Sequence, residues 1–312
     1  MTSPPMDRFT TLMRREWLQH RTGWAVLMGL PAMAMLLLGL FDGHGVQMTV
    51  NGDEHSIAAI NELPVALQTV GWSVATMAVT FVLAALAVLA QLPGLARRDV
   101  QDRSIEFWRS LPTSHVQNVA ALVLMHLLVL PGLALVAAVV AGQVVALVAI
   151  VSQQGAMAWL KQPWWSLLPV LLLVAARALF GLLLAVAWLS PLLLLTMAAS
   201  AWLKRWAVPV VVVMLWVGVE YVDRRLPMPV VRPALERIGS EAFDALLASH
   251  AFKGAHFEGP TDVVAALPDL PAMLLRDAAH VLGNAANPAF VIALLMAALG
   301  FGLLVLHRQR AG

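Results

Sequence analysis

The sequence predicts an all-helical protein with several crossings of a membrane, and three observations lead to that fold class. Of its 312 residues, 60% are hydrophobic and only 12% are charged, which is far from the composition of a soluble domain. Apolar stretches of about 18 or more residues recur along the chain, each long enough to cross a hydrocarbon layer as a helix. These stretches are rich in Leu, Ala and Val without strict alternation, so helices are favoured over a β-barrel.

The N-terminal segment, residues 1–22, is expected to form a helix that rests in the membrane interface, like an elbow before the first crossing. Phe9, Leu12 and Met13 recur at three- and four-residue spacing, while most of the arginines lie on the other side. A cytosolic helix packed on its own protein is the alternative that we favour less. The first crossing follows over residues 24–41, and its apolar run is longer than a signal-peptide core, so we expect it to be retained.

Five further crossings follow from the later apolar stretches. They are expected over residues 65–92, 117–151, 166–201, 206–222 and 288–306. Pro131 and Pro191 interrupt two of them, and each should bend its helix because proline removes a backbone hydrogen bond. Before the last crossing, residues 223–284 should form short amphipathic helices.

The distribution of Lys and Arg predicts the orientation of these six crossings. Twelve of the 20 basic residues lie in the N-terminal segment, the 96–116 loop, the 204–205 turn and the C-terminal tail. The two short loops on the other side contain only Lys161. Because basic loops stay in the cytoplasm, we expect both termini there, residues 223–284 outside, and the chain in a bacterial inner membrane. The net charge of +2 is too small to indicate a nucleic-acid partner.

Several catalytic motifs are absent from the sequence. It contains no GxxxxGK[ST] phosphate-binding loop, no HExxH zinc motif and no GxSxG nucleophile motif. It also contains no cysteine, so disulfides and thiolate metal sites are excluded. We therefore expect no catalytic residue, metal or cofactor in this chain.

Two polar residues within the expected crossings are candidates for a pathway or for helix packing. A buried arginine is costly and is normally paired or faces water, so Arg177 in the fourth crossing is a candidate by default. Its pairing with Glu220 or another outer carboxylate, to fix helix packing, is the interpretation that we favour. His126 in the third crossing is interpreted as a neutral packing residue, since no second His or carboxylate is spaced in the sequence to complete a metal site.

The loop at residues 96–116 places large apolar side chains in a charged setting. Asp102 or Ser104 can cap a short helix that Pro112 ends, and Ser114 and Gln117 have capping-box spacing at the start of the third crossing. The apolar face of this helix would carry Ile105, Phe107, Trp108 and Leu111, with Arg103, Glu106 and Arg109 around it and Arg97, Arg98 and Asp99 beside it. A position at the lipid interface would account for the aromatic residues alone. Aromatic and arginine anchors within a polar rim are typical of a docking surface for another protein.

In this loop the sequence resembles the permease subunits of the type-2 ABC exporter family. The family's inner-loop pattern is an acidic residue, a Ser or Thr, an apolar or aromatic pair, and a Leu-Pro-x-Ser end. The matching residues are Asp102, Ser104, Glu106, Phe107, Trp108, Arg109, Ser110, Leu111, Pro112 and Ser114. The segment WLSPLLLLTMAASAWLKRW, residues 188–206, is similar to the family's turn between the fourth and fifth crossings. The resemblance covers nearly the whole chain as architecture, but only these stretches as motif.

The resemblance implies a function that the motifs alone do not give. It implies that the loop at residues 96–117 is a coupling helix that fits a groove in a separate ATPase subunit. It also implies two ATPase copies that carry ATP and Mg²⁺, and a second permease subunit, expected to be identical, that completes the path across the bilayer. Many family members have a large outer domain between the first two crossings, whereas here the longer outer segment precedes the last one. We therefore expect the outer helices to close the exit rather than to signal to an outer partner.

Two other classes of function stay open. The chain could be an enzyme embedded in the membrane that uses His44, His55 or His256 at the outer face, or a scaffold that anchors a cytoplasmic partner. Activity of the purified chain without an ATPase would favour the enzyme, and a lack of ATP-dependent cargo movement in vesicles would favour the scaffold. The apolar crossings suit a lipid-like, peptide or other amphiphilic cargo better than a bare ion.

Overall fold

The computed structural model describes residues 5–40, 47–50, 53–56, 63–97, 114–251 and 260–310. Within these residues the chain is helical apart from one short hairpin, in which β1 (Gln47–Val50) pairs antiparallel with β2 (Asp53–Ser56). The helical fold class is therefore confirmed, and the hairpin is a small departure from an all-helical chain.

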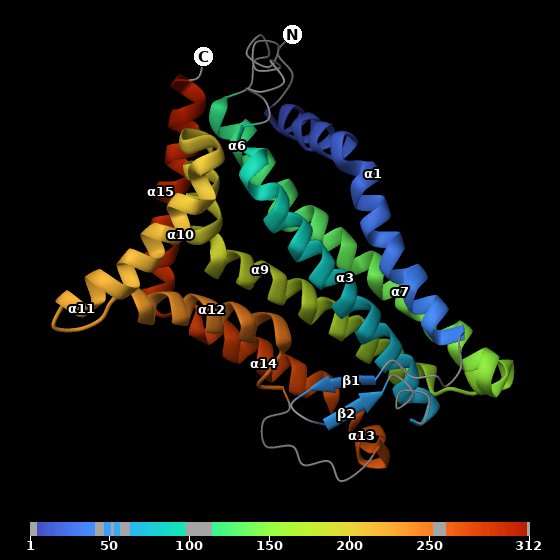
Figure 1. Ribbon diagram of the computed structural model, residues 1–312. Helices are drawn as coiled ribbons and strands as arrows, with labels where there is room; N and C mark the ends of the chain where they lie inside the picture. The colour runs from blue at the N-terminus through green and yellow to red at the C-terminus, as the bar shows by residue number, and fades with distance from the viewer. Residues whose placement is uncertain are drawn as a thin grey trace.

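Five helical stretches of the described chain are long and apolar enough to cross a membrane. They are Arg8–Leu40, Val65–Leu95, His115–Gln154, Trp164–Arg225 and Pro288–Arg310. In Figure 1 the long helices run between two ends of the molecule. The upper end carries both chain termini and is called the termini end. The lower end carries α12 (Val231–Leu247) and α14 (Leu270–Asn284), and is called the α12–α14 end.

The N-terminal helix α1 extends from Pro5 to Leu40 without a break. The interfacial helix expected over residues 1–22 and the crossing expected over residues 24–41 therefore belong to one continuous helix, which Figure 1 shows bending along its length. Leu12, Glu16 and Trp24 are buried on one face of this helix, as their spacing by multiples of four residues requires. A buried carboxylate thus lies on the inward face, where the apolar pattern did not predict one.

The next two long segments pack against each other along their length. Helix α3 (Val65–Leu95) leads toward the termini end, and α6 (His115–Leu124), η1 (Met125–Val129) and α7 (Leu130–Gln154) lead back to the α12–α14 end. A Cβ atom on Gly142 of α7 would lie 2.7 Å from Cα of Ser73 in α3, so only glycine permits this close approach. The element η1 is one π-helical turn just before Pro131. Because proline lacks the N–H that continues an α-helical ladder, the helix widens there instead of breaking.

The stretch Trp164–Arg225 reverses direction at the termini end. After α8 (Ala156–Leu160), helix α9 (Trp164–Leu203) runs to the termini end, and η2 (Lys204–Trp206) joins it to α10 (Ala207–Val217). Lys204 has φ 54° and ψ −123°, a conformation that is rare for a residue with a side chain and that ends α9 sharply. Figure 1 shows α10, η3 (Gly218–Val222) and α11 (Asp223–Arg225) running back toward the other end.

The segment before the last helix lies across the α12–α14 end. Helices α12, α13 (Pro260–Ala266) and α14 precede α15 (Pro288–Arg310), which returns to the termini end. The Asp223 carboxylate accepts the backbone N–H groups of Val230, Val231 and Arg232 at 2.7–2.8 Å, and so caps the start of α12.

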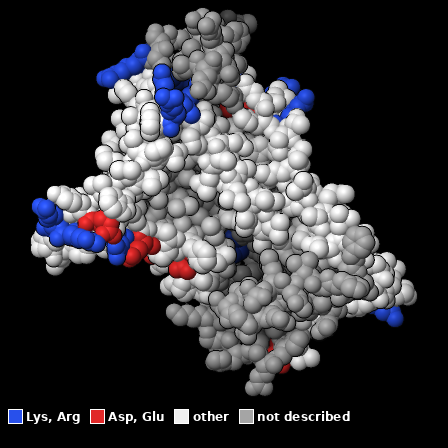
Figure 2. Space-filling view, viewed as in Figure 1, with Lys and Arg blue, Asp and Glu red and all other residues white. Residues whose placement is uncertain are grey.

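The surface between the two ends is apolar. Figure 2 shows charged side chains gathered toward the ends, with a broad uncharged region between them. Large apolar side chains are exposed on the long helices, among them Leu30, Val82, Val140, Val212 and Leu295. A continuous apolar surface of this kind is unfavourable in water and favourable in lipid, as expected for a multi-pass membrane protein.

Candidate functional site

The centre of the expected coupling loop lies outside the described residues, and its two flanks lie at the termini end. The undescribed positions are Arg98, Asp99, Asp102, Ser104, Glu106, Phe107, Trp108, Arg109, Leu111 and Pro112. On one flank, Nε of Arg97 donates to the carbonyl of Pro93 at 3.2 Å. On the other flank, the capping box expected at Ser114 and Gln117 is confirmed, with both reciprocal hydrogen bonds at 3.1 Å. Helix α6 therefore has a fixed start directly after the loop.

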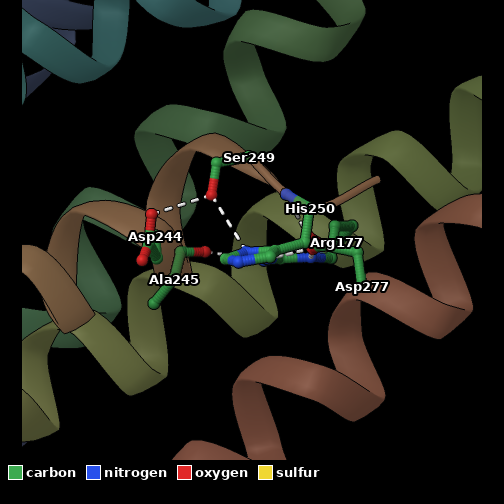
Figure 3. A network of polar contacts seen from close by, with 6 residues as sticks. All are labelled: Arg177, Asp244, Ala245, Ser249, His250 and Asp277. Atoms are coloured by element: carbon green, nitrogen blue, oxygen red, sulfur yellow. Dashed lines mark hydrogen bonds and ion pairs between the residues drawn. The ribbon is translucent and has the colours of Figure 1, made fainter. Parts of the chain in front are cut away.

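Arg177 is buried in the middle of a network that joins three helices (Figure 3). From α9, its Nε donates to Oδ2 of Asp277 in α14 at 2.6 Å, and Nη2 forms an ion pair with the same oxygen at 2.5 Å. Its Nη1 donates to the carbonyl of Ala245 in α12 at 2.7 Å. The other oxygen of Asp277 accepts the backbone N–H of His250 at 3.0 Å. The guanidinium thus ties α9 to both helices of the α12–α14 end.

Polar groups continue from this network toward the surface of the α12–α14 end. The Ser249 hydroxyl donates to Oδ1 of Asp244 at 2.8 Å and lies 3.1 Å from Nδ1 of His250. The rings of His250 and His280 are 4.2 Å apart between centroids. Figure 3 shows the labelled side chains converging beside the Arg177 guanidinium. Because its charge already has a carboxylate and a carbonyl as partners, Arg177 acts in this conformation as a clamp between helices.

Glu220 is not the partner of Arg177, so the first of the two partners that the sequence suggested is wrong. Glu220 lies in η3 and pairs with Arg224 one helical turn later, and its other carboxylate oxygen lies 3.4 Å from Nη2 of Arg232. These basic residues are exposed, and such pairs contribute little to stability. The carboxylate that pairs with Arg177 is instead Asp277, which lies 100 positions further along the chain, within the 223–284 segment.

His126 lies beside a carboxylate and a second histidine that come from a different helix. It is buried in η1, and its Nε2 is 3.5 Å from Oε2 of Glu16 in α1. The rings of His20 and His126 meet edge to face, with 4.5 Å between centroids. The sequence did not predict that these residues lie together, because α1 and η1 are about 100 residues apart. The only pattern that pointed to the group was the i, i+4 spacing of Glu16 and His20, which places both on one face of a helix.

A seam of buried hydroxyl and amide groups runs along α3, and the sequence did not predict it. Its members are Gln68, Thr69, Ser73, Thr76 and Thr80, all on one helical face. Thr69 bonds to Oε1 of Gln162 at 2.7 Å, and Nε2 of Gln143 in α7 donates to the Ser73 hydroxyl at 2.5 Å. Ser73, Thr76 and Thr80 each also donate to the carbonyl four residues earlier. Side-chain hydrogen bonds therefore join α3 to α7 through Gln143 and to the turn before α9 through Gln162.

No protein-family model matches the chain, no curated protein matches it, and no solved structure matches it.

Proposed function

We propose that this chain is the membrane-spanning permease subunit of an ATP-driven exporter of the type-2 ABC class. In this proposal it lies in a bacterial inner membrane, with the termini end in the cytoplasm. Two copies form the path for cargo, and each copy docks an ATPase subunit that binds ATP and Mg²⁺.

The observation that carries the proposal is the position of the coupling-loop flanks. Helix α3 ends at Leu95 and α6 begins at His115, and both points lie at the termini end. The two flanks of the loop with Phe107 and Trp108 therefore lie at the same end as the turn between α9 and α10, which contains Lys204 and Arg205. Basic residues at that face support a cytoplasmic position, where an ATPase would be available.

The course of the chain supports six crossings. Of the five apolar stretches, Trp164–Arg225 contains a reversal at Lys204, so that α9 and α10 with η3 would each cross once. Six crossings return the chain to the side on which it began, which agrees with both termini lying at one end in Figure 1.

The mechanism that we propose starts from movement of the coupling loop. When the ATPases close on ATP, they push the loop, and α3 and α6 move because the loop joins them directly. The hydrogen bonds from Ser73 and Thr69 then carry the movement along α3 to its neighbours. The π-turn before Pro131 and the helix around Pro191 are where the long helices can change their bend.

A copurification experiment tests the docking role of the loop. The tagged chain is purified from membranes of its native host, and ATP hydrolysis in the eluate is measured for the wild type, Trp108→Ala and Arg109→Glu. A central aromatic anchor contributes about 2 kcal/mol or more to the free energy of binding, so its loss should weaken ATPase binding by about 30-fold. The amount of copurified ATPase should fall accordingly when the ATPase concentration is below the dissociation constant. The retained ATP-binding chain is identified by mass spectrometry.

Trp165→Ala is the matched control, because Trp165 is 94% exposed and begins α9 at the opposite end. It should copurify as much ATPase as the wild type does. Equal ATPase activity from Trp108→Ala, Arg109→Glu and the wild type would show that the loop is not the docking surface.

A further inference from the structure

Glu16, His20 and His126 form a compact group of metal-ligating side chains near the termini end. Each offers one ligand atom, and these atoms all lie within 4.8 Å of one another. Glu16 and His20 are four residues apart on α1, so they lie on the same face of that helix. His126 faces them from η1. The group therefore joins the N-terminal helix to the third long helical stretch.

The spacing of the three side chains fits a small divalent metal ion. Ligand atoms about 2.0–2.2 Å from a tetrahedral zinc ion lie about 3.3–3.6 Å from one another. Nε2 of His126 and Oε2 of Glu16 are already 3.5 Å apart. The longest distances between ligand atoms would have to shorten by on the order of 1 Å to reach this geometry, and small side-chain rotations can supply that change.

His126 gives an independent reason to expect a ligand. Its side chain is 1% exposed, and among the described residues its Nε2 makes no hydrogen bond. Buried polar atoms normally have a partner, because leaving one without a partner is costly. It also lies in a π-helical turn, a local widening that is frequent at functional sites. A bound metal would satisfy this nitrogen.

Arg15 contacts the Glu16 carboxylate at a different oxygen from the one that lies beside His126. Nη2 of Arg15 lies 2.9 Å from Oε1 of Glu16, whereas Oε2 is the oxygen beside His126. Carboxylates that bind metals in proteins are commonly held by such a second contact, which sets their orientation. The oxygen that Glu16 presents to His126 is therefore Oε2.

We propose that Glu16, His20 and His126 bind a divalent transition-metal ion, with Zn²⁺ as the favoured occupant. Two imidazoles and one carboxylate suit Zn²⁺ and its neighbours in the first transition row better than Mg²⁺ or Ca²⁺, which require oxygen ligands. Three protein ligands leave one tetrahedral position for water. The ion would fasten α1 to η1, and the proposal does not depend on what the protein transports.

Cobalt titration of the chain tests the site. The chain is purified in detergent without a polyhistidine tag and is stripped with a chelator. Co²⁺ is then added, and its visible absorption is followed. We expect one tetrahedral Co²⁺ per chain, displaced by Zn²⁺ but not by Mg²⁺. Glu16→Gln and His126→Asn should each weaken binding by at least about 100-fold, since even loss of a residue that orients a ligand costs 10–100-fold. His115→Gln removes a histidine outside the group and should bind as the wild type does.

A cysteine at position 20 gives a signal that appears only if this residue is a ligand. The chain has no cysteine of its own, so His20→Cys introduces its only thiol. Thiolate binds Zn²⁺ and Co²⁺, and it should add a sulfur-to-cobalt charge-transfer band while one ion per chain is still bound. His115→Cys is the control and should show no such band.

The possible outcomes separate the metal site from a purely structural group. A wild-type chain with no saturable, one-to-one Co²⁺ spectrum overturns the proposal, as does unchanged affinity in Glu16→Gln and His126→Asn. If those variants fold poorly, the test rests on the folded His20→Cys chain. A charge-transfer band in its Co²⁺ spectrum would support the metal site, and the absence of that band would refute the proposal.

Discussion

At the scale of single residues, the Arg177–Asp277 ion pair is the most consequential interaction in the described chain. Both side chains are almost completely buried, at 4% and 0% exposure. Desolvation of two charges offsets much of their attraction, so the pair as a whole adds little to stability. Each charge nevertheless needs the other, because an unpaired charge in this position has neither water nor a counter-ion.

Removal of one charged partner should therefore lower the free energy of unfolding more than removal of both. We expect Arg177→Met and Asp277→Leu each to lower the free energy of unfolding by about 3–5 kcal/mol, and the double variant to recover a large part of that loss. Thermal unfolding in detergent, followed by tryptophan fluorescence, gives the comparison. Arg276→Gln, at the exposed neighbouring position, should behave as the wild type does. Purely additive losses would mean that the two charges do not interact.

The sequence identified Arg177 and missed its partner for a physical reason. A buried arginine is unusual enough to be noticed from its position in an apolar run alone. Its partner depends on how α14 folds back onto α9, and no local pattern encodes that contact. Glu16 and His20 were missed for the same reason, since their neighbour His126 lies on a different helix.

At the scale of helices, close packing of α9 against α12 depends on one glycine. A Cβ atom on Gly181 would lie 2.2 Å from the carbonyl oxygen of Ala245 and 2.8 Å from Nη1 of Arg177. This same carbonyl accepts a hydrogen bond from Arg177. Any side chain at position 181 would therefore push α12 away and lengthen that bond.

Two glycine-to-alanine substitutions should have opposite effects on stability. Alanine is favoured over glycine within a helix by about 0.5–1 kcal/mol, so Gly239→Ala at an open site on α12 should slightly stabilise the chain. Gly181→Ala gains the same amount but adds a clash with the backbone, typically worth about 1–3 kcal/mol, so the net effect should be destabilising. The melting temperatures of both variants in detergent, compared with that of the wild type, test this prediction. A rise for Gly181→Ala would mean that α12 is free to move away from α9.

Local helix signals were easier to predict than helix boundaries. The capping box at Ser114 needs only residues within one turn, so the sequence is enough to specify it. The expected boundary between an interfacial helix and the first crossing is absent, because α1 is helical from Pro5 to Leu40 and bends along its length. Pro131 was expected to bend its helix, and the structure has one π-turn directly before this proline, which the sequence did not predict.

At the scale of the whole molecule, the two ends differ in charge. The termini end carries the start of α1, the end of α3, the turn between α9 and α10, and the end of α15; the basic residues in or next to these segments are Arg8, Arg14, Arg97, Lys204, Arg205, Arg308 and Arg310. Around α11 and the start of α12, basic and acidic residues are mixed, as Figure 2 shows at the left. The helical class and the apolar stretches follow directly from composition. The number of crossings depends on the reversal at Lys204, which periodicity indicates only weakly.

Single cysteines in this cysteine-free chain test the number and direction of the crossings. The exposed positions Lys161, Arg205 and Arg225 precede, divide and end the stretch Trp164–Arg225. If α9 and α10 each cross once, Lys161→Cys and Arg225→Cys share one side and Arg205→Cys lies on the other. From the charge distribution, we expect a membrane-impermeant maleimide to label the first two from outside intact spheroplasts, and Arg205→Cys only after permeabilisation. Labelling of Lys161→Cys and Arg225→Cys from opposite sides would mean that the stretch crosses only once, and the six-crossing arrangement would then be wrong.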